Sequence, residues 1–179
     1  MLYWQLMEDT RNVVDKYKGL SMEQIVADLD ERGVGLEIAI ENLERDFNMG
    51  TIVRSANAFG VRHVHVIGRR QWNKRGAMMT DKYLHVHYYE SVAEFAKAMV
   101  NKVVIAIDNV PGAVGLSSSS MPPNAVLVFG SEGEGLSPEL LASAQEIREI
   151  PQYGSTRSLN VGVAAGVAMY VWLEQNLSH

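Results

Sequence analysis

Two short runs of the sequence are apolar at every position, and they limit the folds open to the chain. Residues 103–107 and 125–129 are each five apolar residues long, and the segment between them, with Pro111, Gly112 and a run of serines, is expected to be a loop. Strands have this composition when helices cover both faces of their sheet, as in parallel sheets. The fold class predicted is therefore α/β, with a mostly parallel sheet flanked by helices.

Around these runs the sequence alternates between strand-like and helix-like segments. Further strands are predicted at residues 36–40, 63–67, 85–89 and 146–150. Helices are predicted at residues 3–17, 22–32, 49–59, 92–101, 138–144 and 159–175. Ser21 with Gln24, and Ser91 with Glu94, have the spacing of capping boxes that open two of these helices. Strands that alternate with helices are typical of parallel neighbours in one sheet.

The length and composition indicate one ordinary globular domain. The chain has 179 residues, of which we expect 34–179 to form this domain and 1–33 to be an N-terminal helical extension. It contains no cysteine, which excludes disulfides and thiolate metal sites and favours a cytoplasmic location. The longest apolar stretch, 161–173, is shorter than the roughly 20 residues that a membrane span requires, so no membrane association is expected.

A glycine-rich loop with acidic residues follows the second apolar run. It extends from Gly130 to Gly135, and Pro138 is expected to start the next helix. The spacing is not that of a dinucleotide-binding or P-loop motif, and Glu132 and Glu134 would repel a pyrophosphate. The loop therefore suits S-adenosylmethionine, which has a nucleoside and a cationic sulfonium but no phosphate; a plain turn is the alternative.

A second polar turn precedes the helix predicted at residues 49–59. Asn48 is expected to be its N-cap, and Ile52 begins its buried stripe. Arg54 lies about 200° around the helix from Ile52, given about 100° per residue, so its side chain can reach a phosphate or a ribose hydroxyl. The alternative is an arginine that is only solvated.

A third polar turn follows Ile150 and leads to an almost wholly apolar helix. Ser158 is expected to cap this helix, and Asn160 is an unusual polar residue in its first turn. Gly162 and Gly166 are four residues apart and allow another backbone to approach closely, within the fold or across a dimer.

A basic segment follows the strand predicted at residues 63–67. It contains four cations and one tryptophan: Arg69, Arg70, Trp72, Lys74 and Arg75. Cations neutralise phosphates and an aromatic ring can stack on an unpaired base, which is the chemistry of RNA loops. A solvated surface loop is the alternative. The net charge of −5 argues against a protein that coats nucleic acid non-specifically.

Two pairs of histidines have the spacing of strand residues on one face. His63 and His65 form the first pair, and His85 and His87 form the second. A metal site would need a third ligand that the sequence does not supply, so we expect no metal and interpret these residues as strand-surface histidines.

The three polar turns, taken together, resemble the signature motifs of the SpoU/TrmH family of RNA ribose 2′-O-methyltransferases. The matching segments are residues 48–54, 130–136 and 150–161, within a resemblance that covers roughly residues 36–175. The resemblance implies a C-terminal trefoil knot and a homodimer, through the C-terminal helix, whose active site is shared between subunits. It implies functional residues at Asn48, Arg54, Glu132, Ser158 and Asn160. It implies S-adenosylmethionine contacts, largely through backbone groups, at Gly130, Gly135, Ile150 and Leu159.

The resemblance also implies the reaction, in which a ribose 2′-hydroxyl of RNA takes the methyl group of S-adenosylmethionine. The family proposal makes the arginine, here Arg54, the base; because a guanidinium is a poor base, a phosphate clamp that stabilises the developing oxyanion is the alternative. Gln152 and Tyr153 depart from the family pattern, which usually has an apolar residue after Ile-Pro. The substrate expected first is tRNA, and rRNA second. A non-catalytic RNA-binding protein is the rival function, and an NAD-dependent oxidoreductase is a weaker third.

Overall fold

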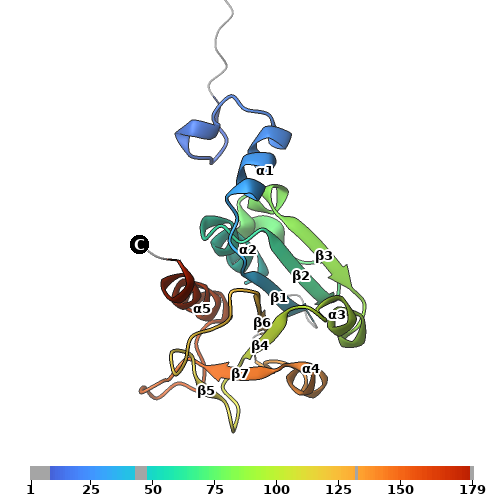
Figure 1. Cartoon of the computed structure of the whole chain (residues 1–179), viewed down its shortest axis with the longest axis vertical. Helices are drawn as coiled ribbons and strands as arrows, with labels where there is room; N and C mark the ends of the chain where they lie inside the picture. Colours follow the sequence, from blue (N-terminus) through green and yellow to red (C-terminus); the bar gives the residue numbers. More distant parts are fainter. Residues whose placement is uncertain (1–8, 43–47, 132, 178–179) are drawn as a thin grey trace, which may run out of the picture.

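The computed structural model describes residues 9–42, 48–131 and 133–177, and its centre is one parallel β-sheet (Figure 1). Seven strands have the order β3-β2-β1-β6-β4-β7-β5, and each neighbouring pair is parallel. The strands are β1 (Glu37–Asn42), β2 (His63–Gly68), β3 (His85–Tyr89), β4 (Val103–Ile107), β5 (Val114–Gly115), β6 (Ala125–Phe129) and β7 (Glu146–Glu149). The α/β prediction is confirmed.

Helices lie on both faces of this sheet (Figure 1). The α-helices are α1 (Met22–Glu31), α2 (Met49–Ala58), α3 (Val92–Ala98), α4 (Pro138–Ser143) and α5 (Val161–Asn176). Within the described ranges the short 3-10 helices are η1 (Asp15–Tyr17), η2 (Lys74–Ala77) and η3 (Thr80–Tyr83). None of the helices in the described part of the chain is long and apolar enough to cross a membrane.

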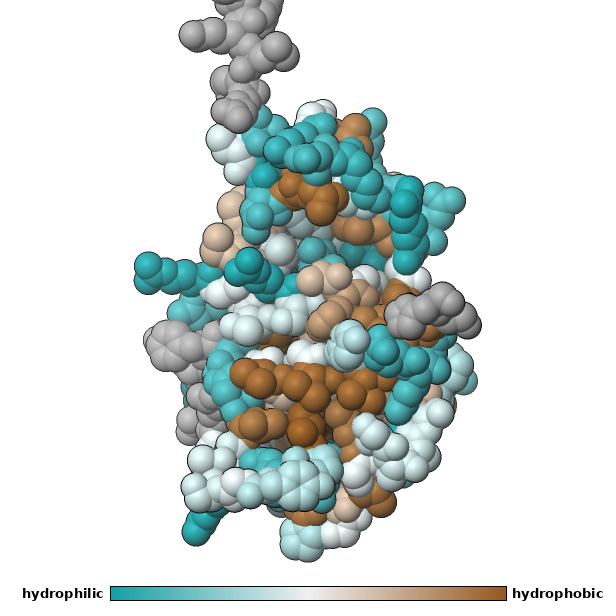
Figure 2. Space-filling model, turned by 90° about the vertical axis from the view of Figure 1, so that its left-hand side faces the viewer, coloured by the Kyte–Doolittle hydropathy of each residue, from teal (hydrophilic) through white to brown (hydrophobic). Residues whose placement is uncertain are grey.

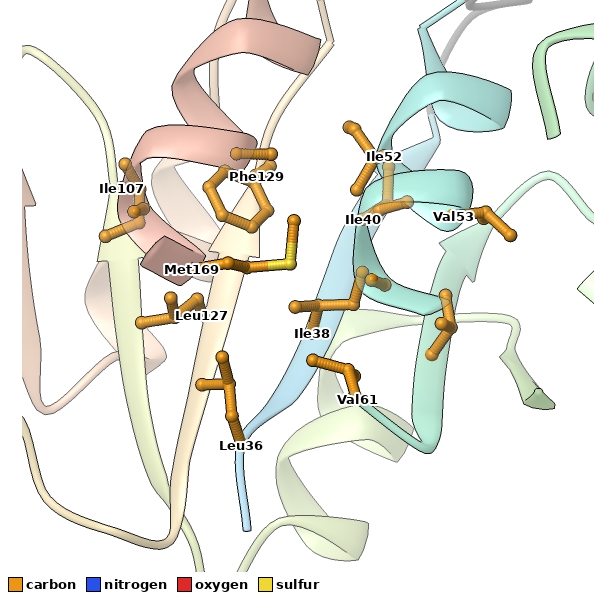
Figure 3. Close-up of a cluster of buried hydrophobic side chains, with 14 of the residues drawn as sticks. Leu36, Ile38, Ile40, Ile52, Val53, Val61, Ile107, Leu127, Phe129 and Met169 are labelled. Carbon is orange, nitrogen blue, oxygen red and sulfur yellow. The ribbon is translucent and has the colours of Figure 1, made fainter. Parts of the chain in front are cut away.

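Alternate residues of the central strands form two separate cores. On β1, Ile38 and Ile40 join the core beneath α2 and α5, whereas Ala39 joins the core beneath α3 and α4. On β6, Leu127 belongs to the first core and Val128 to the second. Figure 3 shows the first core, between the sheet and its two helices. Because successive strand residues point to opposite faces, only strands that are apolar throughout fit this arrangement.

The predicted helix at residues 3–17 is wrong in the part that the structure describes. Residues 9–17 contain only the single turn η1, while residues 3–8 lie outside the described ranges. The Asp9 carboxylate accepts hydrogen bonds from the backbone N–H groups of Arg11 and Gly19, at 3.1 and 2.9 Å. These bonds fold the backbone into a loop around the Asp9 side chain. A helix would require the same backbone to continue in one direction, so the helix does not form.

The two capping residues of α1 behave as predicted. Ser21 Oγ accepts from the backbone N–H of Gln24, and Gln24 Oε1 accepts from the backbone N–H of Ser21. The helix then packs Ile25 against Tyr83 of η3, in a small cluster apart from the main cores. Asp30 near its end accepts a hydrogen bond from the buried Arg62 at 2.8 Å. These contacts attach α1 to the amino-terminal ends of β2 and β3.

The segment expected to be a loop between β4 and β6 contains the short strand β5. Val114 and Gly115 pair with Arg148 and Glu149 of β7. The Arg148 guanidinium is 1% exposed and donates to the backbone carbonyl oxygens of Leu116 and Ser119, at 3.1 and 2.7 Å. A strand of two residues is too short to show an alternating pattern, and a distant buried arginine holds it in place. The sequence analysis therefore did not predict it.

Candidate active site

A cavity of about 610 Å³ lies at the carboxyl ends of β4, β6 and β7. Open α/β sheets bind ligands at this edge. Three segments build the walls: residues 107–110 at the end of β4, residues 129–131 and 133–136 at the end of β6, and residues 150, 152 and 157–161 after β7. Among the predicted site residues, those that line the cavity are Gly130, Gly135, Ile150, Ser158, Leu159 and Asn160. Sequence positions more than 50 residues apart therefore meet at one site.

The glycine loop after β6 folds back so closely that two of its positions require glycine. A Cβ atom at Gly130 would lie 2.2 Å from the backbone carbonyl carbon and oxygen of Gly135. Gly135 has a φ of +71°, and a Cβ atom there would lie 2.7 Å from an oxygen of Asp108. Ser131 and Gly135 also form an isolated antiparallel bridge. The two glycines thus let the loop fold back on itself and pack against Asp108 at the cavity wall.

Two polar residues that the sequence analysis did not select hold the walls together. Asp108 Oδ2 accepts from the backbone N–H of Leu136 at 2.9 Å, which fixes the end of the glycine loop. The Asn109 side-chain amide donates to the backbone carbonyl of Arg157 at 3.1 Å, which joins the first wall to the third. Both residues directly follow the buried strand predicted at 103–107, and that position was the signal that could have identified them.

The charge of the cavity lining matches the expected preference for a cation. Asp108 and Glu134 contribute two carboxylates, and Arg157 contributes one guanidinium. The described lining contains no lysine that could bind a pyrophosphate. Glu132, the other acidic residue that the sequence analysis selected in this loop, lies outside the described residues.

Asn160, and not Ser158, caps helix α5. Asn160 Oδ1 accepts from the backbone N–H groups of Gly162 and Val163, at 3.0 and 3.2 Å. The prediction that Ser158 is the cap was therefore wrong by two residues. The Asn160 amide nitrogen donates to Asn48 Oδ1 at 3.0 Å, which links residues 112 positions apart. Asn160 is therefore polar because its side chain both caps α5 and binds Asn48 of the neighbouring helix.

Asn48 holds the N-cap position of α2 without capping the helix through its side chain. Its side-chain oxygen accepts the hydrogen bond from Asn160 instead. Close to this contact, a Cβ atom at Gly162 would lie 3.1 Å from the methyl group of Thr51, so α2 and α5 touch at their first turns. Arg54, one turn further along α2, is exposed and is not part of the cavity lining. Of the predicted functional residues within the described chain, Ser158 and Asn160 line the cavity and Asn48 contacts it through Asn160, whereas Arg54 does not reach it within this subunit.

Sequence similarity to one protein family covers most of the chain. The sequence model of the SpoU rRNA Methylase family matches residues 35–170, which include all three loops of the site. The chain belongs to this family.

Relatives and solved structures extend the SpoU family match. A Borreliella burgdorferi protein named tRNA (guanosine(18)-2′-O)-methyltransferase is 26% identical over 141 residues, which are 75% of this chain but only 64% of that relative. The Aquifex aeolicus TrmH/SpoU tRNA modifying enzyme superposes with a TM-score of 0.76 and 25% identity, covering 86% of this chain and 81% of that one. A structure concerned with 2-OH methylation of C/U34 on tRNA superposes with a TM-score of 0.70 and 28% identity, covering 78% of this chain and 95% of that one.

The basic segment of this SpoU family member lies against α2 and outside the cavity. A Cβ atom at Gly50 of α2 would lie 2.8 Å from the Gly76 Cα atom, so the two backbones are in direct contact. Trp72 is half-buried against the first core, and Lys74 Nζ lies 5.5 Å from the centre of its ring. Arg75 is exposed. The segment therefore lies beside the helix that carries Arg54.

The four histidines form a stacked row on β2 and β3. His63 stacks on His85 and His87, and His65 stacks on His87, with ring centroids 5.0–5.2 Å apart. His63 Nδ1 and His87 Nε2 are 3.0 Å apart and share one hydrogen bond. Burial lowers the pKa of both His63 and His87. In the described residues no group of three or more His, Cys, Asp or Glu side chains is arranged to hold a metal ion.

Glu37 of β1 faces this histidine row as a carboxylate. It accepts a hydrogen bond from His65 Nε2 at 2.7 Å and pairs with Lys102 Nζ at 2.6 Å. Burial raises the pKa of Glu37, but the hydrogen bonds from His65 and Lys102 outweigh burial and bring it down to about 2. The row lies at the amino-terminal ends of its strands, whereas the cavity lies at the carboxyl ends, so the histidines belong to the structure of the sheet and not to the site.

Proposed function

We propose that this protein transfers a methyl group from S-adenosylmethionine to a ribose 2′-hydroxyl of RNA, with tRNA as the first candidate substrate and rRNA as the second. One observation carries the proposal: a tightly folded glycine loop and an asparagine-capped helix line an acidic cavity in a SpoU family chain. The names of two relatives, both of which concern methylation of tRNA, support the choice of tRNA. Because those names refer to guanosine 18 and to C/U34, the nucleotide is left open.

The residues of the cavity fit S-adenosylmethionine. Its volume is within the range of about 300–1,000 Å³ that small-ligand sites occupy. Backbone groups at Gly130, Gly133 and Gly135 can donate to and accept from an adenine base, and Ile150 and Leu159 offer apolar contacts. Asp108 and Glu134 favour a cation, and S-adenosylmethionine supplies a methyl group on a positively charged sulfur.

The chemical step requires the 2′-oxygen to be held in line with the methyl carbon. A new O–C bond then forms as the C–S bond breaks, S-adenosylhomocysteine leaves, and the hydroxyl proton passes to solvent or to a neighbouring base. Alignment of reactants can supply several kcal/mol of such a barrier, on the order of 7–11 at most. We assign the clamp on the adjacent phosphate to Arg54, with Asn48, Ser158 and Asn160 at the reacting end of the cavity. Arg54→Ala should abolish transfer and leave S-adenosylmethionine binding nearly unchanged.

We also propose that the active unit is a homodimer, because α5 is apolar on the side that faces away from the sheet. Val163, Val167 and Tyr170 follow one another at helical spacing and are 54%, 38% and 53% exposed. Figure 2 shows the molecular face on which α5 lies, where apolar side chains gather. A helix that is apolar all round is normally buried, and a second copy of the same chain would cover this face in a symmetric interface. Such a partner could bring its Arg54 to the cavity.

Mixed dimers test the shared site. At a donor concentration near the wild-type Kd, Arg54→Ala subunits should be inactive alone and Gly130→Ala subunits nearly so, because one lacks the clamp and the other binds the donor weakly. After subunit exchange of an equal mixture, about a quarter of wild-type activity should return, since half of the dimers then contain one intact site. A mixture that stays inactive, although sedimentation shows mixed dimers, would place Arg54 and the cavity in the same subunit.

The finer features of the fold are also proposals. Membership of the SpoU family supports a trefoil knot in the segment from β6 to α5. It also supports residues 34–179 as the methyltransferase domain, with residues 1–33 as an appended arm. The lack of cysteine and an RNA substrate both favour the cytoplasm. Calorimetry with S-adenosylmethionine and with NAD separates a methyltransferase from an oxidoreductase. We expect S-adenosylmethionine to bind and NAD not to bind.

A further inference from the structure

The last two residues of β1 are polar, although this strand lies in the middle of the sheet. Glu41 and Asn42 are 2% and 1% exposed, whereas the preceding residues Ile38, Ala39 and Ile40 are all apolar. Burial of a carboxylate and an amide is costly unless their hydrogen bonds compensate. The bonds that these two side chains form therefore indicate what they do.

Glu41 binds the end of the glycine loop. Its Oε2 atom accepts from the backbone N–H of Ser137 at 2.7 Å, while Asp108 accepts from the backbone N–H of Leu136 at 2.9 Å. Glu41 belongs to β1, and Asp108 directly follows β4. These two strands are the neighbours of β6 in the sheet. The loop that leaves β6 is thus held at two consecutive amides by carboxylates from both adjoining strands.

Asn42 binds the basic segment in the same way on the opposite face of the sheet. Its amide nitrogen donates to the backbone carbonyl oxygens of Arg69 and Gln71, at 2.6 and 3.2 Å. Its own backbone carbonyl accepts from the N–H of Arg69 at 3.0 Å. Because consecutive strand residues point to opposite faces, the adjacent residues Glu41 and Asn42 bind two different loops, one on each face of the sheet.

We propose that Glu41 and Asn42 are two separate positioning residues, Glu41 for the loop that binds the methyl donor and Asn42 for the loop that binds RNA. This inference rests on the proposed function for its two ligands. Neither side chain touches donor or RNA; each acts through the backbone of the loop that it holds. If these residues only stabilised the fold, substitution of either one would weaken the binding of both ligands. If each residue positions one loop, its substitution weakens the binding of one ligand only.

Two substitutions at each position isolate the hydrogen bonds. Glu41→Leu removes the acceptor at similar volume, and Glu41→Gln keeps one acceptor oxygen without the charge. Asn42→Asp replaces the donor with an acceptor that faces two carbonyl oxygens, and Asn42→Leu removes the donor without placing an acceptor there. Hydrogen bonds of this kind are worth enough to change a binding constant about tenfold when one is lost.

The experiment measures both ligands on the full-length variants, with calorimetry for S-adenosylmethionine and filter binding for bulk tRNA. Glu41→Leu should weaken donor binding about tenfold and RNA binding less than about twofold, with most of the loss restored in Glu41→Gln. Asn42→Asp should do the reverse. Equal losses of both ligands in either variant, or no loss in either, would overturn the assignment.

Hydrogen exchange provides a readout that does not depend on the proposed function. Glu41→Leu should speed exchange in residues 133–137 and leave residues 69–76 unchanged, and Asn42→Asp should show the opposite pattern. If wild-type protein binds neither ligand but the exchange pattern holds, the proposed function fails while the positioning roles stand. If Asn42→Asp does not fold, Asn42→Leu carries the same comparison, and if Glu41→Leu does not fold, Glu41→Ala removes the same acceptor. Exchange that rises in both segments at once contradicts the proposal.

Discussion

Replacement of Gly130 by alanine should disable the cavity, because the glycine loop has no room for a side chain at this point. The new Cβ atom would lie 2.2 Å from the backbone of Gly135, and an ordinary contact begins near 3.4 Å. The loop would therefore have to move by about 1.2 Å, the difference between these two distances. Such a shift breaks the 2.9 Å bond between Leu136 and Asp108, and loss of a hydrogen bond to a charged group costs about 1.5–3 kcal/mol. Binding of S-adenosylmethionine should weaken by roughly ten- to a hundredfold.

The matched control for this variant is Gly154→Ala in the loop after β7. A Cβ atom at Gly154 would meet nothing within 4 Å, and this glycine has no positive φ. Calorimetry should therefore show wild-type binding of the donor for Gly154→Ala and weak binding for Gly130→Ala, with thermal unfolding to verify that both proteins are folded. Wild-type affinity in Gly130→Ala would refute the view that this loop forms the donor site.

Two further predictions concern the histidine row and the basic segment. Burial lowers the pKa of His63 and His87 below their ordinary value of 6.5, so the unfolded chain binds more protons and stability should fall as the pH drops through 6.5. Urea midpoints at pH 7.5 and 5.5 should differ less in His87→Phe than in wild type, and an equal difference would contradict the reasoning. Lys74 is paired with Asp81 at 2.8 Å, whereas Arg75 forms no ion pair within the described chain, so Arg75→Ala should reduce the salt dependence of tRNA binding more than Lys74→Ala. Each lost phosphate contact lowers the slope by about 0.7–0.9, and equal slopes for the two variants would count against a role for Arg75.

The parallel sheet could be predicted from sequence because its strands are apolar on both faces. The runs at residues 103–107 and 125–129 became β4 and β6 with the expected bounds. Local patterns failed where a distant residue decides the structure. β5 depends on Arg148, and the loop at residues 9–17 depends on a carboxylate that reaches Gly19.

The cap of α5 illustrates the same limit at the site. Serine and asparagine are both good N-cap residues, so propensity could not choose between Ser158 and Asn160. The choice follows from the contact between Asn160 and Asn48, which exists only once α2 and α5 meet. Asp108 and Glu41 were missed for a similar reason, since each binds a backbone amide of the glycine loop from a neighbouring strand.

The position of the transferred methyl group tests the central claim most directly. Wild-type protein is incubated with bulk tRNA and methyl-labelled S-adenosylmethionine, and the RNA is then hydrolysed with alkali, which cannot cut next to a 2′-O-methylated ribose. The account predicts that the label appears in alkali-resistant dinucleotides and that Arg54→Ala gives none. Label on mononucleotides, which would indicate a methylated base, or no transfer to any RNA by a protein that binds the donor, would contradict it.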